Sequence, residues 1–201
     1  MTASILVTGG SGQLATALAE AAPMPGLSVC RVGRPALDFD RPASIAEVFA
    51  MNAPLLVVNA AAYTAVDAAE DAEAAAFRAN RDGPAELARR CQAAGIPLIH
   101  VSTDYVFDGL KGAPYIETDP TAPQGVYGAS KLAGENAVLA TCSRAIVLRT
   151  SWVYSSTGRN FVRTMLAAGQ RNSGLRVVAD QTGCPTSAHD LHRRFRAWRR
   201  G

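Results

Sequence analysis

The sequence has no uninterrupted apolar stretch of about 18 residues, so it predicts no transmembrane helix. It also has no basic segment before its first apolar run, which argues against a signal peptide. Its four cysteines are scattered and show none of the C-x-x-C spacing of metal and redox sites. We therefore expect buried free thiols, no metal centre and a reducing, cytoplasmic location, without a membrane partner.

The positive charge is unevenly distributed along the 201 residues. The formal net charge is +3, but five arginines lie within the last ten positions. From Ser187 onward we expect a helix with Leu191, Phe195 and Trp198 on one face. Such a tail could bind nucleic acid or an anionic membrane. We favour a helix packed on the domain, or a shifted reading frame, and expect no nucleic-acid partner.

A strand, a glycine turn and a helix open the chain. The run 4–8 is apolar and β-branched, Gly9 and Gly12 follow it, and 14–22 has helical composition. This is the setting of a dinucleotide-binding turn, where glycines let the backbone approach a pyrophosphate and the helix N-terminus offers free amides. The alternative is a plain glycine-rich turn without a ligand. The flanking elements favour the nucleotide.

The second strand is expected over 27–32, followed by Gly33 and Arg34. An acidic residue usually holds the 2′-hydroxyl of NAD at this point, whereas Arg34 suits the 2′-phosphate of NADP. The alternative is an exposed arginine without a ligand. The run 36–39 could form a short third strand. Asp38 could contact the adenine or cap the next helix.

Two later strands end in residues suited to ligand binding. The apolar run 54–58 leads into 59–64, whose small residues would let a ligand lie close to the backbone. The apolar run 97–102 leads into Thr103 and Asp104. Ligands bind at the carboxyl ends of strands in open α/β sheets. We therefore expect a doubly wound parallel sheet of the Rossmann type with a site at this edge.

The remaining elements follow from composition and periodicity. They are a helical region over 66–94 that breaks near Asp71, a loop over 109–124, a helix from about 126 to 139, a strand over 144–150, a helix over 160–168, a strand over 175–178 and a loop over 180–186.

Tyr127 and Lys131 stand four residues apart on one helix. This spacing places a phenol and an ammonium on the same helix face. Free tyrosine ionises near pH ~10, and a nearby lysine cation favours the phenolate, so we expect a lowered Tyr127 pKa and acid–base chemistry. The alternative is an exposed tyrosine beside a solvated lysine.

Six stretches in this order resemble the extended short-chain dehydrogenase/reductase family: TGGSGQLA (8–15), VVNAAAYTAVDAAE (57–70), STDYVFDG (102–109), YGASKLAGE (127–135), RTSWVY (149–154) and DQTGCPTS (180–187). The resemblance implies an NAD(P)-binding Rossmann domain over 1–155. It implies a partial, truncated substrate-binding region over 156–201, because family members continue beyond this point. Activity of the short chain is therefore in question.

By the same resemblance, Thr103, Tyr127 and Lys131 form the catalytic trio. The residues implied to line the cofactor are Gly9, Gly12, Gln13, Leu14, Asp38, Phe39, Ala62, Tyr63 and Thr64, together with Tyr127 and Lys131. Thr103, Asp104 and Trp152 are implied to touch the substrate.

The most similar branch of the family reduces the 4-keto group of dTDP-4-dehydro-L-rhamnose, with NADPH or NADH, to give dTDP-L-rhamnose. The resemblance is also compatible with a homodimer and with Mg²⁺, although no ligand cluster in the sequence points to a metal. The alternative is a non-catalytic NAD(P)-binding subunit resembling the regulatory subunit of methionine adenosyltransferase. An intact trio favours the enzyme, because a pure binding protein does not need all three residues.

Overall fold

The computed structural model describes residues 3–20, 26–172, 174–191 and 193. Its strands are β1 (Ala3–Thr8), β2 (Leu27–Val32), β3 (Leu56–Asn59), β4 (Leu98–Thr103), β5 (Ala145–Thr150), β6 (Val153–Tyr154) and β7 (Thr186–Ser187). Its helices are α1 (Gln13–Glu20), α2 (Pro42–Asn52), α3 (Val66–Asp71), α4 (Glu73–Phe77), α5 (Gly83–Ala94), α6 (Val126–Thr141) and α7 (Phe161–Gly169), with a π-helical segment η1 (Arg78–Asp82) and a 3₁₀ turn η2 (Asp104–Val106).

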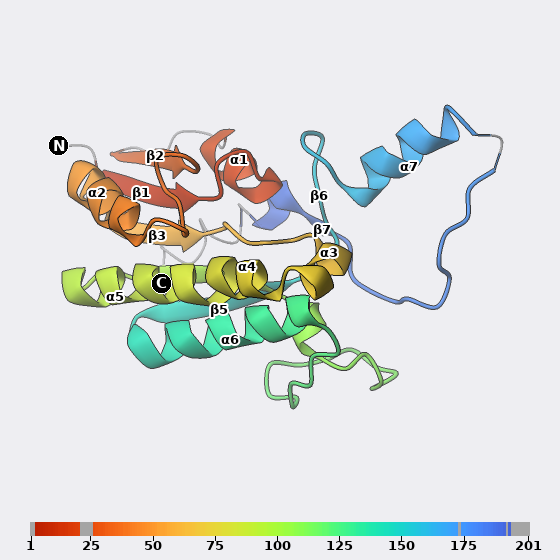
Figure 1. The fold of residues 1–201 in the computed structure, drawn as a ribbon. Coiled ribbons are helices and arrows are strands. Elements are labelled where there is room, and N and C mark those ends of the chain that lie inside the picture. The colour runs from red at the N-terminus through yellow and green to blue at the C-terminus, as the bar shows by residue number, and fades with distance from the viewer. Residues whose placement is uncertain (1–2, 21–25, 173, 192, 194–201) are drawn as a thin grey trace.

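Strands β1 to β5 form one parallel sheet in the order β2-β1-β3-β4-β5. Figure 1 shows this sheet between α1 and the helices α5 and α6. Strand β2 lies on one side of β1, and the chain then crosses back over β1 to form β3 on its other side. The direction of strand addition therefore reverses between β1 and β3. Ligands of doubly wound sheets bind at the carboxyl ends of strands beside such a reversal. The parallel Rossmann-type sheet predicted from the sequence is confirmed.

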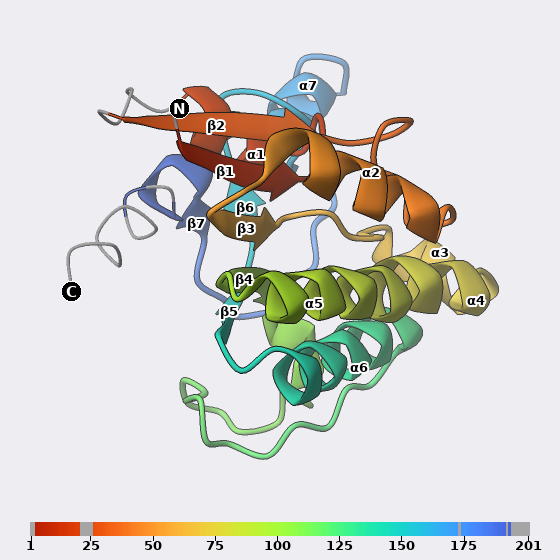
Figure 2. The same ribbon diagram turned by 90° about the vertical axis from the view of Figure 1, so that its left-hand side faces the viewer.

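Neighbouring residues of each strand point to opposite faces of the sheet, and helices cover both faces. One core joins the sheet to α2, α5 and α6 through Leu6, Ile45, Val57, Leu87, Leu98 and Val138. The other joins it to α1 through Val7, Leu14, Leu18, Val58, Ile99 and Leu191. Figure 2 shows α5 and α6 side by side, with α2 above them. The site therefore rests on strands that are packed from both sides.

The predicted helical region 66–94 is confirmed, and its break near Asp71 separates α3 from α4. A π-helical segment then precedes α5. It places Asn80, which is fully buried, against α6. Single π turns of this kind frequently occur at functional sites.

Three expectations are wrong. No strand forms over 36–39, where a turn closes by a hydrogen bond from the Leu37 amide to the Gly33 carbonyl (3.1 Å). No strand forms over 175–178, whose side chains are exposed and face no neighbouring strand in the described chain. Of the four cysteines, only Cys91 and Cys142 are buried, while Cys184 is exposed.

The chain beyond β5 is packed less closely. Strand β6 pairs with β7, and α7 stands apart from the main sheet without a buried residue (Figure 1). The predicted C-terminal helix is present over 188–191, and Leu191 is buried against the α1 side of the sheet. Phe195 and Trp198 lie outside the described residues. No helix in the described part of the chain is long and apolar enough to span a bilayer.

Candidate active site

A cleft with a volume of about 410 Å³ opens at the carboxyl ends of β1, β3, β4 and β5. Ten of the residues singled out from the sequence line it: Gly12, Gln13, Leu14, Ala62, Thr64, Thr103, Asp104, Tyr127, Lys131 and Trp152. These residues come from distant parts of the chain, and the sheet brings them to one edge.

The glycine turn forms one wall of the cleft. Gly9 has φ 109°, a region open to glycine, and a Cβ there would lie 2.9 Å from the Ala60 carbonyl oxygen. The helical hydrogen bonds begin with the Thr16 amide on the Gly12 carbonyl (2.9 Å), so the amides of residues 13–15 have no acceptor within α1. Gln13 is fixed by Asn160, whose amide donates to its Oε1 (2.9 Å). The turn is thus shaped to receive an anionic group.

The loop after β3 is held by a buried asparagine. Asn80 Oδ1 accepts from the Tyr63 amide (2.8 Å), and its Nδ2 donates to the Tyr63 carbonyl (3.1 Å). The same Nδ2 donates to Ser130 Oγ (2.9 Å), and Ser130 Oγ donates to the Tyr127 carbonyl (2.8 Å). One side chain therefore ties this loop to the helix that carries Tyr127 and Lys131.

Thr103 and Asp104 lie where β4 ends. The Thr103 hydroxyl donates to Asp104 Oδ1 (3.1 Å), and its oxygen accepts from the Tyr105 amide (3.2 Å). Burial raises the pKa of Asp104, against the effect of the Thr103 hydrogen bond and of two backbone amides. A threonine hydroxyl and a carboxyl group thus face the cleft together.

Tyr127 is buried on α6, with the Tyr105 ring edge-on at 5.5 Å. Burial raises the pKa of Tyr127; the Thr103 side chain lowers it, and the Asp104 carboxylate raises it again. The expectation that Lys131 lowers this pKa is therefore wrong for this structure. The phenol keeps its proton at neutral pH and can act as an acid.

The contacts of Lys131 explain why the Tyr127 pKa does not fall as expected. Its Nζ donates to the Val101 carbonyl oxygen (2.7 Å), so the ammonium is engaged by β4. Burial lowers the pKa of Lys131 to about 8, and the Glu135 carboxylate opposes that shift. Glu135 is itself buried and makes a bidentate ion pair with Arg149, the shortest N–O distance being 2.7 Å. A lysine with this pKa changes its charge close to physiological pH.

A chain of buried polar groups runs under the cleft through three strands. Thr8 Oγ1 donates to Asn59 Oδ1 (2.6 Å), and Asn59 Nδ2 lies 2.9 Å from His100 Nδ1. Because Asn59 accepts on its oxygen, its nitrogen donates, and His100 carries its proton on Nε2. Burial, followed by the Lys131 cation, lowers the pKa of His100 well below its usual value, so the ring is neutral. Sequence reasoning missed this chain.

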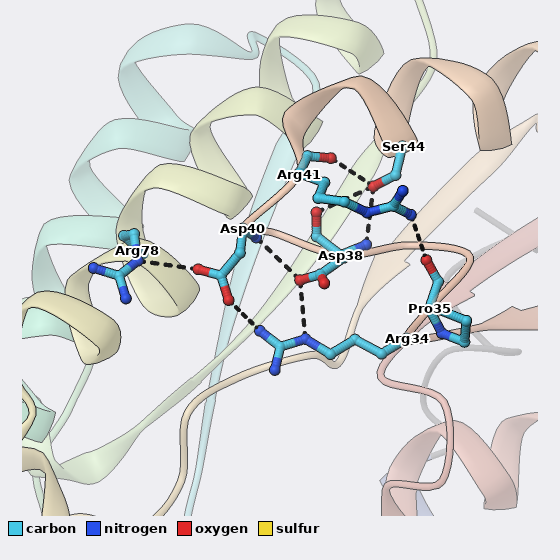
Figure 3. A network of polar contacts seen from close by, with 7 residues as sticks. All are labelled: Arg34, Pro35, Asp38, Asp40, Arg41, Ser44 and Arg78. Carbon is cyan, nitrogen blue, oxygen red and sulfur yellow. Dashed lines mark hydrogen bonds and ion pairs between the residues drawn. The ribbon is translucent and has the colours of Figure 1, made fainter.

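Arg34 and Asp38 lie outside the cleft wall, at the end of β2 (Figure 3). Arg34 pairs with Asp38 (2.9 Å) and Asp40 (2.6 Å), so it is neither isolated nor unpaired. The Asp38 carboxylate accepts from Arg34 and from the Asp40 amide, and the N-terminus of α2 has no side-chain cap. The hydrogen bond from the Asp40 amide lowers the pKa of Asp38 most. Burial raises this pKa, and the Arg34 cation lowers it further. The predicted Asp38 cap on α2 is therefore wrong.

Phe39 and Tyr63 were also expected at the cofactor. The Phe39 ring packs against the core on the α2 and α5 side, and a Cβ on Gly83 would overlap it. The Tyr63 side chain packs beside Tyr127 and Ala69. Neither residue lines the cleft.

Trp152 follows β5 directly and lines the cleft with 45% of its surface exposed. Its φ of 47° lies in a region that non-glycine residues seldom adopt. The loop after 180 packs on the indole, since a Cβ on Gly183 would lie 3.0 Å from the ring. The indole thus contributes a flat aromatic surface to the cleft.

Several cleft residues escaped the sequence analysis, among them Ser102, Tyr105, Thr150, Ser151 and Arg159. Ser102 Oγ and Thr150 Oγ1 are buried and have no hydrogen-bond partner among the described residues. Both stand at strand ends, so the rule that selected Thr103 could have found them. Within the described residues no group of three His, Cys, Asp or Glu could hold a metal ion.

Comparisons with known proteins give the family. A family model described as the RmlD substrate binding domain matches residues 2–198. The chain is 49% identical over 187 residues to a dTDP-4-dehydrorhamnose reductase of Sinorhizobium fredii, covering 93% of this chain and 63% of the relative. The chain therefore spans less than two thirds of that relative.

Solved structures agree with this similarity. The dTDP-4-dehydrorhamnose reductase of Bacillus anthracis, in complex with NADP, has a TM-score of 0.94 and 35% identity, covering 98% of this chain and 70% of that one. The Clostridium acetobutylicum dTDP-4-dehydrorhamnose reductase has a TM-score of 0.92 and 38% identity, covering 96% and 69%.

Proposed function

The chain belongs to the RmlD substrate binding domain family, and from this premise we propose that it is an NADPH-dependent oxidoreductase. The proposed reaction reduces the 4-keto group of dTDP-4-dehydro-L-rhamnose to give dTDP-L-rhamnose. The convergence of Thr103, Tyr127 and Lys131 on one cleft is the observation that carries the proposal. A cleft that only binds a nucleotide has no need of a buried phenol beside a buried lysine.

The glycine turn supports a dinucleotide as cofactor. Gly9 packs closely against the Ala60 backbone, and Gly12 to Leu14 at the start of α1 line the cleft. A pyrophosphate fits such a backbone cradle, where amides and the helix dipole meet the negative charge. NADPH, when bound, supplies a hydride to the carbonyl carbon of the substrate. NADH would use the same cradle.

Tyr127 is proposed as the proton donor. Its raised pKa keeps the hydroxyl protonated at neutral pH, so it can donate to the substrate oxygen as negative charge develops there. Thr103 would stabilise the same oxygen by a hydrogen bond. To do so, its hydroxyl must turn from Asp104 Oδ1 to the substrate. The Tyr105 amide holds the Thr103 oxygen in place meanwhile.

Lys131 is proposed to hold the cofactor ribose and to supply positive charge near Tyr127. Its ammonium donates to the carbonyl of Val101, which also lines the cleft, and the Glu135 carboxylate favours the charged form of the lysine. A cation there attracts the negative charge that develops on the substrate oxygen. The charge is complete only below the Lys131 pKa of about 8.

Asp104 and Trp152 are proposed to contact the sugar nucleotide, because the indole offers a flat face and the carboxyl group a hydrogen-bonding partner. We propose residues 1–155 as the NAD(P)-binding domain and 156–201 as part of the substrate-binding region. The chain covers 63% of its relative's length. Under this division, nucleotide binding needs only the first domain.

Product formation tests the function. The 201-residue chain, in excess over dTDP-4-dehydro-L-rhamnose, is mixed with NADPH, and dTDP-L-rhamnose is detected by mass spectrometry. Gly9→Ala should abolish the reaction by distorting the turn, because the added Cβ would lie 2.9 Å from the Ala60 carbonyl oxygen. Gly109→Ala is the matched control, because Gly109 also has a positive φ (77°) but open space around it. Absence of product from the parent chain, with NADPH demonstrably bound, would contradict the proposed reaction.

A further inference from the structure

Four charged side chains form a continuous network at the edge of the proposed cofactor site (Figure 3). Arg34 Nη2 pairs with Asp40 Oδ2 (2.6 Å), and its Nε pairs with Asp38 Oδ1 (2.9 Å). Asp40 Oδ1 accepts in turn from Arg78 Nε (3.0 Å). Arg34 follows β2, whereas Arg78 opens η1. Two arginines from separate parts of the chain thus pair with two carboxylates of one loop.

The network lies beside the glycine turn. The Gly10 amide donates to the Val32 carbonyl (3.0 Å), and a Cβ on Gly33 would lie 2.7 Å from Gly10 Cα. Arg34 is therefore one residue from the place where β2 touches the turn. In doubly wound folds this is where a side chain meets the 2′ position of the adenosine ribose.

The two carboxylates are held differently. The Asp38 side chain is 19% exposed, and its Oδ1 also accepts from the Asp40 amide (3.1 Å). The Asp40 side chain is 47% exposed and gives one oxygen to each arginine. Arg34 has five N–H donors and uses one for each carboxylate, so a 2′-phosphate that bound its remaining Nη donors would lie close to the Asp40 carboxylate. Arg78 would neutralise part of that negative charge.

We propose that Asp40 is a specificity-determining residue that weakens the preference of this site for NADPH over NADH. Its carboxylate competes with a 2′-phosphate for Arg34 and repels that phosphate. Arg78 acts through Asp40, because it neutralises the competitor without itself being required at the ribose. The inference rests on the proposed function, since it concerns how the same site selects its nucleotide.

The expected effects are modest because all three pairs are partly exposed. Asp40→Asn should raise the ratio of the NADH to the NADPH dissociation constant by roughly fivefold at low salt. Arg34→Ala should bring the ratio close to one. Both effects should shrink as ionic strength rises, since salt screens exposed charges.

Arg78→Ala provides the sharper test. With Arg78 absent, Asp40 should hold Arg34 more firmly, and the ratio should fall by roughly two- to threefold. In the Asp40→Asn background, Arg78→Ala should change nothing. If Arg78 touched the phosphate directly, its removal would lower the ratio in both backgrounds. A double-mutant cycle therefore separates action through Asp40 from direct contact.

The experiment is a calorimetric titration of NADPH and NADH into the 201-residue chain and these variants. Asp82→Asn is the matched control, because Asp82 makes a comparably exposed ion pair with Arg81 (2.6 Å) outside the network. An unchanged ratio in Asp40→Asn, with both nucleotides bound, overturns the inference and leaves the proposed function standing. Failure of the parent to bind either nucleotide overturns the proposed function itself, and the inference with it.

Discussion

Asn80→Ala should destabilise the fold and weaken NADPH binding together. The side chain makes three hydrogen bonds, two to the Tyr63 backbone and one to Ser130 Oγ, and it is fully buried. Truncation would leave the Tyr63 amide and carbonyl without a partner, at about 1 kcal/mol or more for each lost bond. We expect a loss of about 3 kcal/mol, which lowers the melting temperature by roughly 6–12 °C for a chain of this size.

Urea unfolding followed by circular dichroism measures the free energy of unfolding, and NADPH titration measures binding. We expect at least a tenfold rise in the NADPH dissociation constant, because the loop at Ala62 and Thr64 loses its anchor to α6. Asn172→Ala is the control, since the Asn172 amide donates to the Ala168 carbonyl on an exposed surface (3.1 Å). A variant within about 1 kcal/mol of the parent, with unchanged binding, would refute the role assigned to Asn80.

Two further predictions concern pH. The rate of a single turnover should fall as pH rises through about 8, because Lys131 loses its charge there. Glu135→Gln should move that fall to lower pH, because the Glu135 carboxylate raises the Lys131 pKa. A rate that stays constant between pH 7 and 9.5 would contradict this prediction. His100 stays neutral in the fold but gains a proton near pH ~6.5 when unfolded, so the unfolded chain binds more protons and stability should drop as pH falls below that value. Melting temperatures of the parent and His100→Asn between pH 7.5 and 5 test this, and equal slopes would exclude His100 as a cause.

The position of the site could be predicted because short apolar runs ending in polar residues are typical of parallel strands. Thr103 and Asp104 were found in this way, whereas Tyr127 was found by its spacing from Lys131 and Trp152 by the family resemblance, and all four line one cleft. The runs 36–39 and 175–178 have similar composition, yet they form no strand. Strand formation needs a partner edge, and composition does not reveal whether one is within reach.

The pairing of side chains could not be predicted either, because composition does not show which groups the fold brings within reach. The four-residue spacing of Tyr127 and Lys131 placed them on one helix face, but the lysine ammonium donates to the Val101 carbonyl. The expected fall in the Tyr127 pKa was therefore replaced by a rise, caused first by burial. Arg34 was considered alone, although Asp40 and Arg78 share its charge. Such contacts join residues far apart in sequence and follow only from the folded chain.

Tyr127→Phe tests the central claim, that this phenol donates the proton in a keto reduction. The measurement is the single-turnover rate of NADPH oxidation with dTDP-4-dehydro-L-rhamnose, together with the NADPH dissociation constant. We expect the rate to fall by a factor on the order of 10² or more. The dissociation constant should stay within about twofold, since only a hydroxyl is removed. A variant that reacts at nearly the parent rate would contradict the assignment of Tyr127 as proton donor.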